Sequence, residues 1–402
     1  MPNKGFFAES TLISKAPESK KPRCGTCGIY KKCRSPKMEV TGKGKKGILI
    51  VGEAPGTNED EQGKQFVGDS GKLLEQVLSE FNINMRRDCW LTNSLICRPP
   101  NNRNPTANEI SYCRPNLTNT IAELNPTLIL LFGEVAVSSL IGSLWKENPG
   151  DIGRWVGWHI PCQEINAWIC PNWHPSFVLS SEGTQQGRVI SLLFEKYMVE
   201  ALEHSSRPWD TVPDYEKEVE VVFETGRAAA IIRKMIQKGG VISFDYETDR
   251  LKSDHEDATI TCASVCWQGR KTISFPWNEE TSSAMSELLL SDVQKVGQNI
   301  KFEQRWTKRI LGHGIRNWIR DDMLGMHVMD NRRGVTGLKF QVFAWLGYGS
   351  YNDHIEPFFK SKGSNEQNRI NEIDKRQLLL YCGLDSLLEF KLYEVQKERG
   401  LL

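Results

Sequence analysis

Short apolar runs alternate with amphipathic segments along the first half of the chain. The runs GILIVGE, WLTNSLI and TLILLFG occupy residues 47–53, 90–96 and 127–133. Consecutive apolar residues over so few positions are typical of parallel strands that are buried on both faces. Between and after these runs, apolar residues recur with helical spacing at 73–81, 107–124 and 187–204. This alternation predicts an α/β domain in which helices cover a parallel sheet.

The second half has a different order of elements. The polar segment SSRPWDTVPDYEKEVE contains two prolines, and we interpret it as a linker. A helix is expected over 227–238, followed by the strand GGVISFDYET and by ATITCASVCW and KTISFPW, whose alternation is typical of antiparallel strands. The remainder is predicted to be mostly helical. We therefore expect an α/β domain over 1–205, a linker over 206–220 and a separate α+β domain over 221–402.

Composition narrows the function classes only slightly. The chain has 51 basic and 50 acidic residues, so its net charge neither indicates nor excludes a nucleic-acid partner. No apolar run is long enough for a membrane span, and the polar N-terminus lacks the apolar core of a signal peptide. We expect an intracellular protein without a membrane partner. In a reducing compartment, the eleven cysteines are expected to bind metal or fill the core rather than form disulfides.

Five cysteines of the first half form a candidate metal site. Cys24 and Cys27 make a CGTC motif, and Cys33 follows six residues later; Cys97 precedes the loop RPPNNRNP, and Cys113 lies in the helix expected after it. Zinc and an iron–sulfur cluster both accept such a set of thiolates. The other cysteines lie in apolar surroundings and are expected in the core: Cys89, Cys162, Cys170, Cys262, Cys266 and Cys382.

Three motifs of the first half occur together with these cysteines. They are GEAPGTNEDEQGKQFVGDSGKLL, TNSLICRPPNNRNP and NWHPS, within residues 24–203. In order and spacing this region resembles the family 4 (iron–sulfur) uracil-DNA glycosylases. The resemblance implies an α/β/α parallel-sheet fold and a [4Fe–4S] cluster on Cys24, Cys27, Cys97 and Cys113. Cys33 is additional to the family pattern, and it either replaces Cys27 or is a bystander.

The resemblance also assigns roles that the chemistry supports. Phe66 would stack on a uracil taken out of the helix, and the Asn93 amide would pair with its N3–H and O4 while rejecting cytosine. His174 would donate to O2 as the leaving base becomes an anion. Glu53 would hold the attacking water or stabilise the sugar cation, and Glu59 would face uracil C5 and crowd the methyl group of thymine. Gln65 stands where the family usually has proline, and we expect it to loosen this loop.

The second half of the chain contains another group of candidate site residues. Asp245 and Glu247 of FDYET point to the same face of a strand, and Tyr381 and Asp385 of YCGLD share one side of a helix. Glu303 of NIKFE lies just inside a predicted helix start. Over residues 225–402 this pattern resembles the DEDDy 3′–5′ exonucleases, the proofreading domains of family A DNA polymerases. The resemblance implies a ribonuclease H-like α+β domain.

The exonuclease resemblance implies a site for two Mg²⁺ or Mn²⁺ ions. Asp245, Glu247, Asp385 and Glu303 would be the ligands, although Glu303 replaces the aspartate that is usual in the family. Tyr381 would orient the attacking water. Asp321, in RDDML, is interpreted as a helix cap rather than a ligand.

The sequence therefore predicts a DNA-processing enzyme that excises uracil and degrades DNA from single-stranded 3′ ends, in the cytoplasm of a bacterial or phage-infected cell. The pairing resembles the N-terminal region of some bacteriophage family A polymerases, and the chain is then either a stand-alone protein or a part of a polymerase. Two alternatives remain open. In one, the first domain binds uracil or modified bases without cleaving them while the exonuclease or a polymerase subunit acts. In the other, the whole cluster-bearing domain is purely structural.

Overall fold

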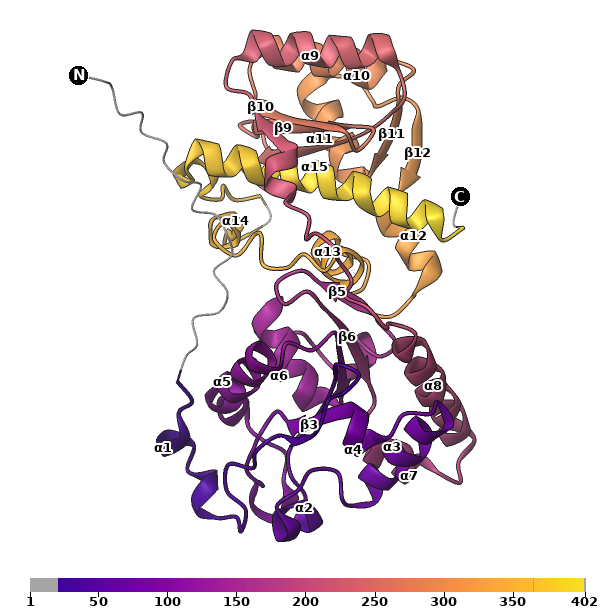
Figure 1. The fold of residues 1–402 in the computed structure, drawn as a ribbon. Coiled ribbons are helices and arrows are strands. Elements are labelled where there is room, and N and C mark those ends of the chain that lie inside the picture. The colour runs from indigo at the N-terminus through magenta and orange to yellow at the C-terminus, as the bar shows by residue number, and fades with distance from the viewer. Residues whose placement is uncertain (1–20, 364, 401–402) are drawn as a thin grey trace, which may run out of the picture. The chain divides into compact units, whose positions relative to one another are not determined.

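The computed structural model describes residues 21–363 and 365–400 and divides into two compact units between Pro208 and Trp209. Each unit has its own six-stranded sheet (Figure 1). The predicted linker 206–220 lies at this division. Its second half contains the 3-10 helix η4 (Tyr215–Glu218) and the start of strand β7 (Val219–Val221), because buried Tyr215 packs with the core of the second unit.

The sheet of the first unit follows the order β1-β3-β2-β4-β6-β5. The four central strands are parallel, and the two short edge strands run antiparallel to their neighbours. Their bounds are β1 Thr41–Gly42, β2 Ile48–Gly52, β3 Cys89–Asn93, β4 Leu128–Phe132, β5 Ile160–Cys162 and β6 Ala167–Asn172. Every residue of β2 and β4 is buried, as the continuous apolar runs predict. Strand β6, which the apolar pattern did not single out, completes the parallel set.

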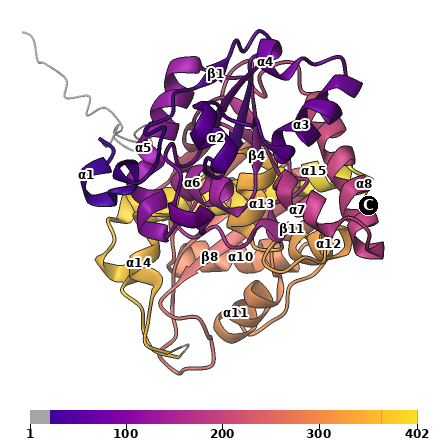
Figure 2. The same ribbon diagram turned by 90° about the horizontal axis from the view of Figure 1, so that it is seen from below.

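Helices cover both faces of this sheet. α5 and α6 lie on one side, and α3, α7 and α8 lie on the other (Figure 1 and Figure 2). The bounds are α1 Cys24–Cys27, η1 Ile29–Lys31, α2 Thr57–Gln62, α3 Asp69–Glu80, α4 Met85–Asp88, η2 Pro100–Asn102, α5 Ala107–Leu124, α6 Glu134–Leu144, η3 Ile152–Arg154, α7 Pro175–Ser181 and α8 Gln185–Leu202. Apolar residues of α3 and α8 join those of the strands in one core cluster. The predicted α/β/α layers are confirmed.

The sheet of the second unit follows the order β12-β11-β8-β9-β10-β7. β8, β9 and β10 are antiparallel, as predicted, while β11 and β12 lie parallel to β8. The strands after β7 are β8 Val241–Thr248, β9 Ile260–Trp267, β10 Lys271–Pro276, β11 Gln294–Gly297 and β12 Trp318–Asp321. The remainder is mostly helical, as predicted, but the sequence did not reveal β11 and β12, because four residues are too few to give a recognisable alternation.

Helices also cover both faces of the second sheet. α9 and α10 pack with one side, and the long α15 lies along the other (Figure 1). The helices are α9 Thr225–Lys238, α10 Glu279–Leu290, α11 Lys301–Leu311, α12 Asp322–Met329, α13 Leu338–Leu346, α14 Glu356–Phe359, η5 Ile370–Glu372 and α15 Lys375–Glu398. Gly383 lets α15 approach β7 closely, since a Cβ there would lie 2.3 Å from Val219 Cγ1. Within the described residues, no helix is both long and apolar enough to cross a membrane.

Candidate functional sites

Three predicted glycosylase residues, and a glycine that the sequence did not single out, lie at the carboxyl ends of four adjacent parallel strands. Glu53 follows β2, Asn93 ends β3, Gly133 follows β4 and His174 comes two residues after β6. In open α/β sheets, ligands bind at this edge because the strand ends present loops and helix N-termini there. The fold therefore gathers residues from positions 53 to 174 at one edge of one sheet.

Gly52 is the point at which the predicted base-binding groups meet. A Cβ at this position would lie 2.4 Å from Asn93 Oδ1 and 2.9 Å from Cζ of Phe66. Gly52 is also the register partner of Asn93 in the parallel pair β2–β3. The amide and the aromatic ring thus flank the same strand end, and only a residue without a side chain leaves the space between them open.

The loop before α3 holds Phe66 in an uncommon backbone conformation. Phe66 has φ 54°, in the left-handed region that residues other than glycine rarely adopt. Two donors fix the loop, because Arg86 Nη1 and Nη2 bind the carbonyl oxygens of Gln65 and Phe66 at 2.8 and 2.7 Å. Gly71 allows α3 to approach, since a Cβ there would lie 2.0 Å from the carbonyl oxygen of Phe66.

Gln65 contradicts the expectation that it loosens this loop. Its side chain is buried, its Nε2 donates to the carbonyl oxygen of Glu39 at 2.5 Å, and its Oε1 accepts from Thr41 Oγ1 at 2.7 Å. The expectation considered only the lost rigidity of a proline ring. A glutamine amide can both donate and accept, and here it ties the loop to strand β1.

His174 caps α7 with its own side chain. Ser176 N–H donates to Nδ1 at 3.2 Å, and Ser176 Oγ lies 2.7 Å from the same nitrogen. Because Nδ1 accepts from the backbone, the proton of the neutral ring lies on Nε2. Burial lowers the pKa of His174 to about 4, and the charge of Glu59 opposes this only in part. The ring is therefore a neutral donor through Nε2 at physiological pH.

Glu53 lies at the N-terminus of α6. Its Oε1 accepts from Val135 N–H at 3.4 Å, and a Cβ at Gly133 would lie 2.3 Å from the same oxygen. Burial raises the pKa of Glu53, while the Val135 N–H lowers it. A carboxylate in this setting can accept a proton from water more readily than an exposed glutamate.

Glu59 has a structural part in the same loop. Its Oε1 accepts from Val67 N–H and Gly68 N–H at 3.1 and 2.9 Å, and its Oε2 accepts from Gly56 N–H at 3.2 Å. The Glu59 carboxylate thereby ties α2 to the segment after Phe66. That Glu59 also faces uracil C5 stays a prediction.

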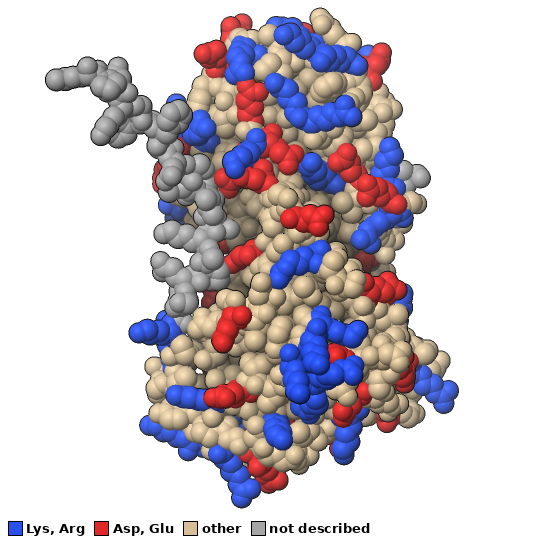
Figure 3. All heavy atoms as spheres, in the orientation of Figure 1, with Lys and Arg blue, Asp and Glu red and all other residues tan. Residues whose placement is uncertain are grey.

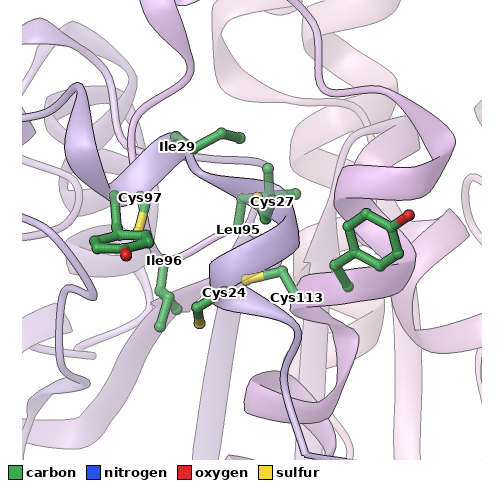
Figure 4. Close-up of a pocket in the computed structure, with 9 residues that line it drawn as sticks. Cys24, Cys27, Ile29, Leu95, Ile96, Cys97 and Cys113 are labelled. Atoms are coloured by element: carbon green, nitrogen blue, oxygen red, sulfur yellow. The ribbon is translucent and has the colours of Figure 1, made fainter.

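Four cysteines line one cavity, shown in Figure 4. Cys24 and Cys27 come from α1, Cys97 from the loop after β3, and Cys113 from α5. Two of these four sulfurs accept hydrogen bonds from residues other than the cysteines. Cys97 Sγ accepts from Lys37 N–H at 3.2 Å, and Cys113 Sγ accepts from Asn116 Nδ2 at 3.4 Å. Donors to sulfur of this kind accompany metal-bound thiolates.

The thiols that line this cavity oppose one another's ionisation. Burial raises the pKa of Cys97 to about 12 and also raises that of Cys113, and neighbouring thiols add to both shifts. A set of thiols that oppose one another's ionisation fits a cationic metal group.

Cys33 lies beside this cavity without lining it. It packs against the cluster of Ile29, Leu95 and Cys97, and its Sγ lies 3.8 Å from the carbonyl oxygen of Tyr30. The six cysteines expected in the core are all buried.

In the second unit, Asp245 and Glu247 lie on β8 as predicted, two residues apart on one face. α15 is fixed over them by two buried serines. Ser243 Oγ donates to the carbonyl oxygen of Ser386 at 2.5 Å, and Ser264 Oγ donates to that of Cys382 at 2.7 Å. These bonds hold the helix turn between Tyr381 and Asp385 opposite the two carboxylates. Burial and the charge of Asp385 raise the pKa of Asp245, and burial and Asp245 raise that of Glu247.

Asp385 has two partners that the sequence reasoning missed. Tyr351 O–H donates to its Oδ1 at 2.7 Å, and the Lys339 ammonium contacts the same oxygen. Lys339 also lies over the rings of Tyr351 and Tyr381, at 4.2 and 4.5 Å from their centroids. Lys339 and Tyr351 come 46 and 34 residues before Asp385, so no short spacing could have linked them.

Glu303 is the third residue of α11, as predicted, and only 3% of it is exposed. Its Oε2 is buried without a hydrogen-bond partner in the described part of the chain. Burial, and next Asp245, raise its pKa well above the usual range. A buried oxygen without a partner beside other carboxylates fits a site for divalent ions. Asp321 caps α12 by accepting from Met323 N–H at 3.0 Å, which confirms its interpretation as a cap.

Each half of the chain matches the model of a known family. The uracil DNA glycosylase superfamily matches residues 40–203, and the family "3′-5′ exonuclease" of DNA polymerase A type matches residues 220–397. Among solved structures, the catalytic core of RRP6 from Trypanosoma brucei aligns with 46% of this chain and 47% of its own, at 14% identity and a TM-score of 0.35. Such a TM-score is too low to support a conclusion.

Curated relatives include both single-domain glycosylases and a longer polymerase. The type-4 uracil-DNA glycosylase of Saccharolobus solfataricus is 37% identical over 160 residues, 39% of this chain and 73% of that protein. That of Sulfurisphaera tokodaii is 33% identical over 201 residues, 46% of this chain and 89% of that protein. The DNA polymerase of Bacillus phage SP01 is 32% identical over 388 residues, 89% of this chain and 40% of the polymerase. The chain thus belongs, through its first half, to the type-4 uracil-DNA glycosylase family and carries a 3′–5′ exonuclease domain in its second.

Proposed function

We propose that this chain excises uracil from DNA by hydrolysing the N-glycosidic bond and degrades DNA in the 3′-to-5′ direction. The observation that carries the first activity is the meeting of Asn93 and Phe66 at Gly52, with His174 at the same edge of the sheet, two residues after β6. Family membership supports the same reading.

In the glycosylase site, each residue has a distinct task. Phe66 stacks on the flipped base, and the Asn93 amide accepts from N3–H and donates to O4. His174 donates from Nε2–H to O2, where negative charge develops as the bond to the sugar breaks. Glu53 holds the water that attacks C1′ and accepts its proton, a task that its raised pKa suits. Glu59 excludes the thymine methyl group from the C5 side.

The four cavity cysteines, Cys24, Cys27, Cys97 and Cys113, hold a [4Fe–4S] cluster in this proposal. The convergence of the four thiols on one cavity and the relationship of the first half to type-4 uracil-DNA glycosylases support this assignment. With a cluster bound, these cysteines would cross-link α1, the loop after β3 and α5. They would also steady the base-binding edge, because that loop follows Asn93 directly.

In the exonuclease site, Asp245, Glu247, Asp385 and Glu303 hold two Mg²⁺ or Mn²⁺ ions. Such ions lower the pKa of water and stabilise the leaving 3′ oxygen. Tyr381, opposite Asp245 on α15, orients the attacking water. Lys339 and Tyr351 hold Asp385 in place through its Oδ1.

DNA is the shared partner of both sites. On the face drawn in Figure 3, acidic and basic side chains intermix, and lysines and arginines gather into a compact group on the first unit. A local basic group attracts the phosphate backbone even when the total charge is near zero.

The similarity to a phage DNA polymerase over most of this chain favours a role in replication. The exonuclease would then proofread for a polymerase domain or subunit, while the glycosylase domain acts on uracil in the template. In the alternative, that domain binds uracil or modified bases without cleaving them, and Glu53 is dispensable.

A uracil-containing oligonucleotide separates these alternatives. Excision leaves an abasic site that alkali cleaves, whereas binding alone leaves the strand intact. Alkali-labile product from wild-type protein, formed about a hundredfold more slowly by His174→Ala, supports catalysis. Tight binding of uracil-containing DNA with no abasic product supports the binding-only alternative and overturns the proposed excision.

A further inference from the structure

Cys382 lies against the two carboxylates of β8. Its Sγ and one oxygen each of Asp245 and Glu247 lie within 4.8 Å of one another. In residues 21–363 and 365–400, no other three His, Cys, Asp or Glu side chains bring ligand atoms so close together. The sequence reasoning counted Cys382 as a core residue, because its neighbours on α15 are apolar.

Two contacts with neighbouring strands hold Cys382 in place. Ser264 Oγ donates to the carbonyl oxygen of Cys382 at 2.7 Å, and the Cys382 Sγ lies 3.8 Å from the carbonyl oxygen of Asp245. Cys382 is fully buried and Glu247 is 7% exposed. The helix turn that presents Asp385 to the carboxylates therefore presents a sulfur to them as well.

The neighbouring Cys262 gives a useful contrast. It is the register partner of Glu247 across β8–β9, and it is also buried. It is not part of the group of close ligand atoms. Two buried cysteines thus lie near the same glutamate and interact with each other, and only Cys382 has its sulfur within 4.8 Å of an oxygen of both carboxylates.

We propose that Asp245, Glu247 and Cys382 form a mixed oxygen–sulfur site that takes a borderline-soft divalent cation, such as Zn²⁺ or Co²⁺. The inference rests on the proposed exonuclease function of this domain and specifies which ion its site prefers. Mg²⁺ selects oxygen ligands only, whereas a thiolate favours later and softer divalent metals. On binding, the Cys382 thiol releases its proton to solvent and its sulfur donates an electron pair, so no redox step is involved.

Cobalt provides a direct test, because a thiolate bound to Co²⁺ gives a charge-transfer absorption that oxygen ligands do not give. Co²⁺ is titrated into wild-type protein, Cys382→Ser and the matched control Cys262→Ser. Contributions from the cysteines of the first half are common to all three proteins and cancel in difference spectra. We expect the thiolate band in the difference between wild type and Cys382→Ser, and none in the difference between wild type and Cys262→Ser. Co²⁺ affinity should fall about tenfold or more in Cys382→Ser.

Equal spectra and equal Co²⁺ affinities in wild type and Cys382→Ser overturn the inference. Cys382→Ala, which leaves no hydroxyl in the core, repeats the titration if the serine variant does not fold. An assay for 3′ digestion with Mg²⁺ on the same preparations keeps the two claims apart. If wild type digests DNA and the cobalt spectra are equal, only the proposed sulfur ligand is refuted. If no divalent ion supports digestion, the exonuclease function on which the inference rests is refuted.

Discussion

Arg86 donates a hydrogen bond to the carbonyl oxygen of Phe66 at 2.7 Å, while a second nitrogen of the same guanidinium binds Gln65 at 2.8 Å. A non-glycine residue in the left-handed region costs of order 1–3 kcal/mol unless its surroundings hold it there. With φ 54°, Phe66 is such a residue. The planar fork of Arg86 therefore positions the ring on which the flipped base is expected to stack.

Arg86→Lys should weaken uracil excision although it keeps the charge, because one ammonium cannot reproduce two fixed donors. Stacking of a base on an aromatic ring contributes about 1–3 kcal/mol, so partial loss of it should lower kcat/KM about tenfold. Single-turnover kinetics on a uracil-containing duplex measure this. Arg87→Lys is the matched control, since its partner Asp88 lies outside the loop; equal losses in both variants would refute the positioning role.

Gly52→Ala should abolish excision while the protein stays folded. Its new Cβ would lie 2.4 Å from Asn93 Oδ1 and 2.9 Å from the Phe66 ring, in the space that the base needs. We expect a loss of at least about a hundredfold, since misplaced catalytic geometry has effects of this size. Gly337→Ala, where a Cβ meets nothing within 4 Å, controls for the removal of a glycine. Full activity of Gly52→Ala would mean that uracil binds elsewhere.

His174→Ala should lower excision about a hundredfold or more, the usual effect of removing one donor to a developing anion. The pKa of His174, lowered to about 4 by burial, implies a neutral ring from about pH 5 upwards. In the unfolded chain the ring protonates near its ordinary value of about 6.5. Its contribution to stability is therefore complete above that value and is lost as the pH falls towards 4. NMR titration of the ring, assigned with His174→Gln, checks this; a midpoint near 6.5 in the folded protein would contradict it.

Cys113→Ser should cost the protein its cluster, because it removes one of the four thiols that line the cavity. Cys33→Ser should retain the cluster, because Cys33 packs beside the cavity without lining it. Anaerobically purified wild type and Cys33→Ser should contain about four irons per chain. Iron analysis and visible absorption measure this, and loss of iron from Cys33→Ser would make Cys33 a ligand.

Most candidate site residues were indicated by motifs that resemble two families, since strand patterns alone gave Glu53 and Asn93 no role. The two-residue spacing of Asp245 and Glu247 is different, because strand periodicity by itself fixes their common face of β8.

The sequence did not reveal residues that bind backbone carbonyl groups or that contact a site residue far away in the chain. Arg86 binds two carbonyl groups, which leave no trace in the amino-acid pattern. Lys339 and Tyr351 reach Asp385 across tens of residues, from α13 and from the loop after it. Gln65 was misjudged because its side chain bonds Thr41 of β1, an edge strand too short to be recognised, and the carbonyl oxygen of Glu39 just before that strand.

The central claim is that one chain carries two independent activities, one of which needs divalent ions. The most direct measurement follows a 5′-labelled single strand with one internal uracil, incubated with wild type and with Asp245→Ala, each with Mg²⁺ or with EDTA. Wild type with Mg²⁺ should shorten the strand from its 3′ end and leave alkali-labile abasic sites. Asp245→Ala, and wild type in EDTA, should leave the 3′ end intact and still excise uracil at the wild-type rate. Digestion by Asp245→Ala in a preparation free of other nucleases, or loss of excision in that variant, would contradict the account.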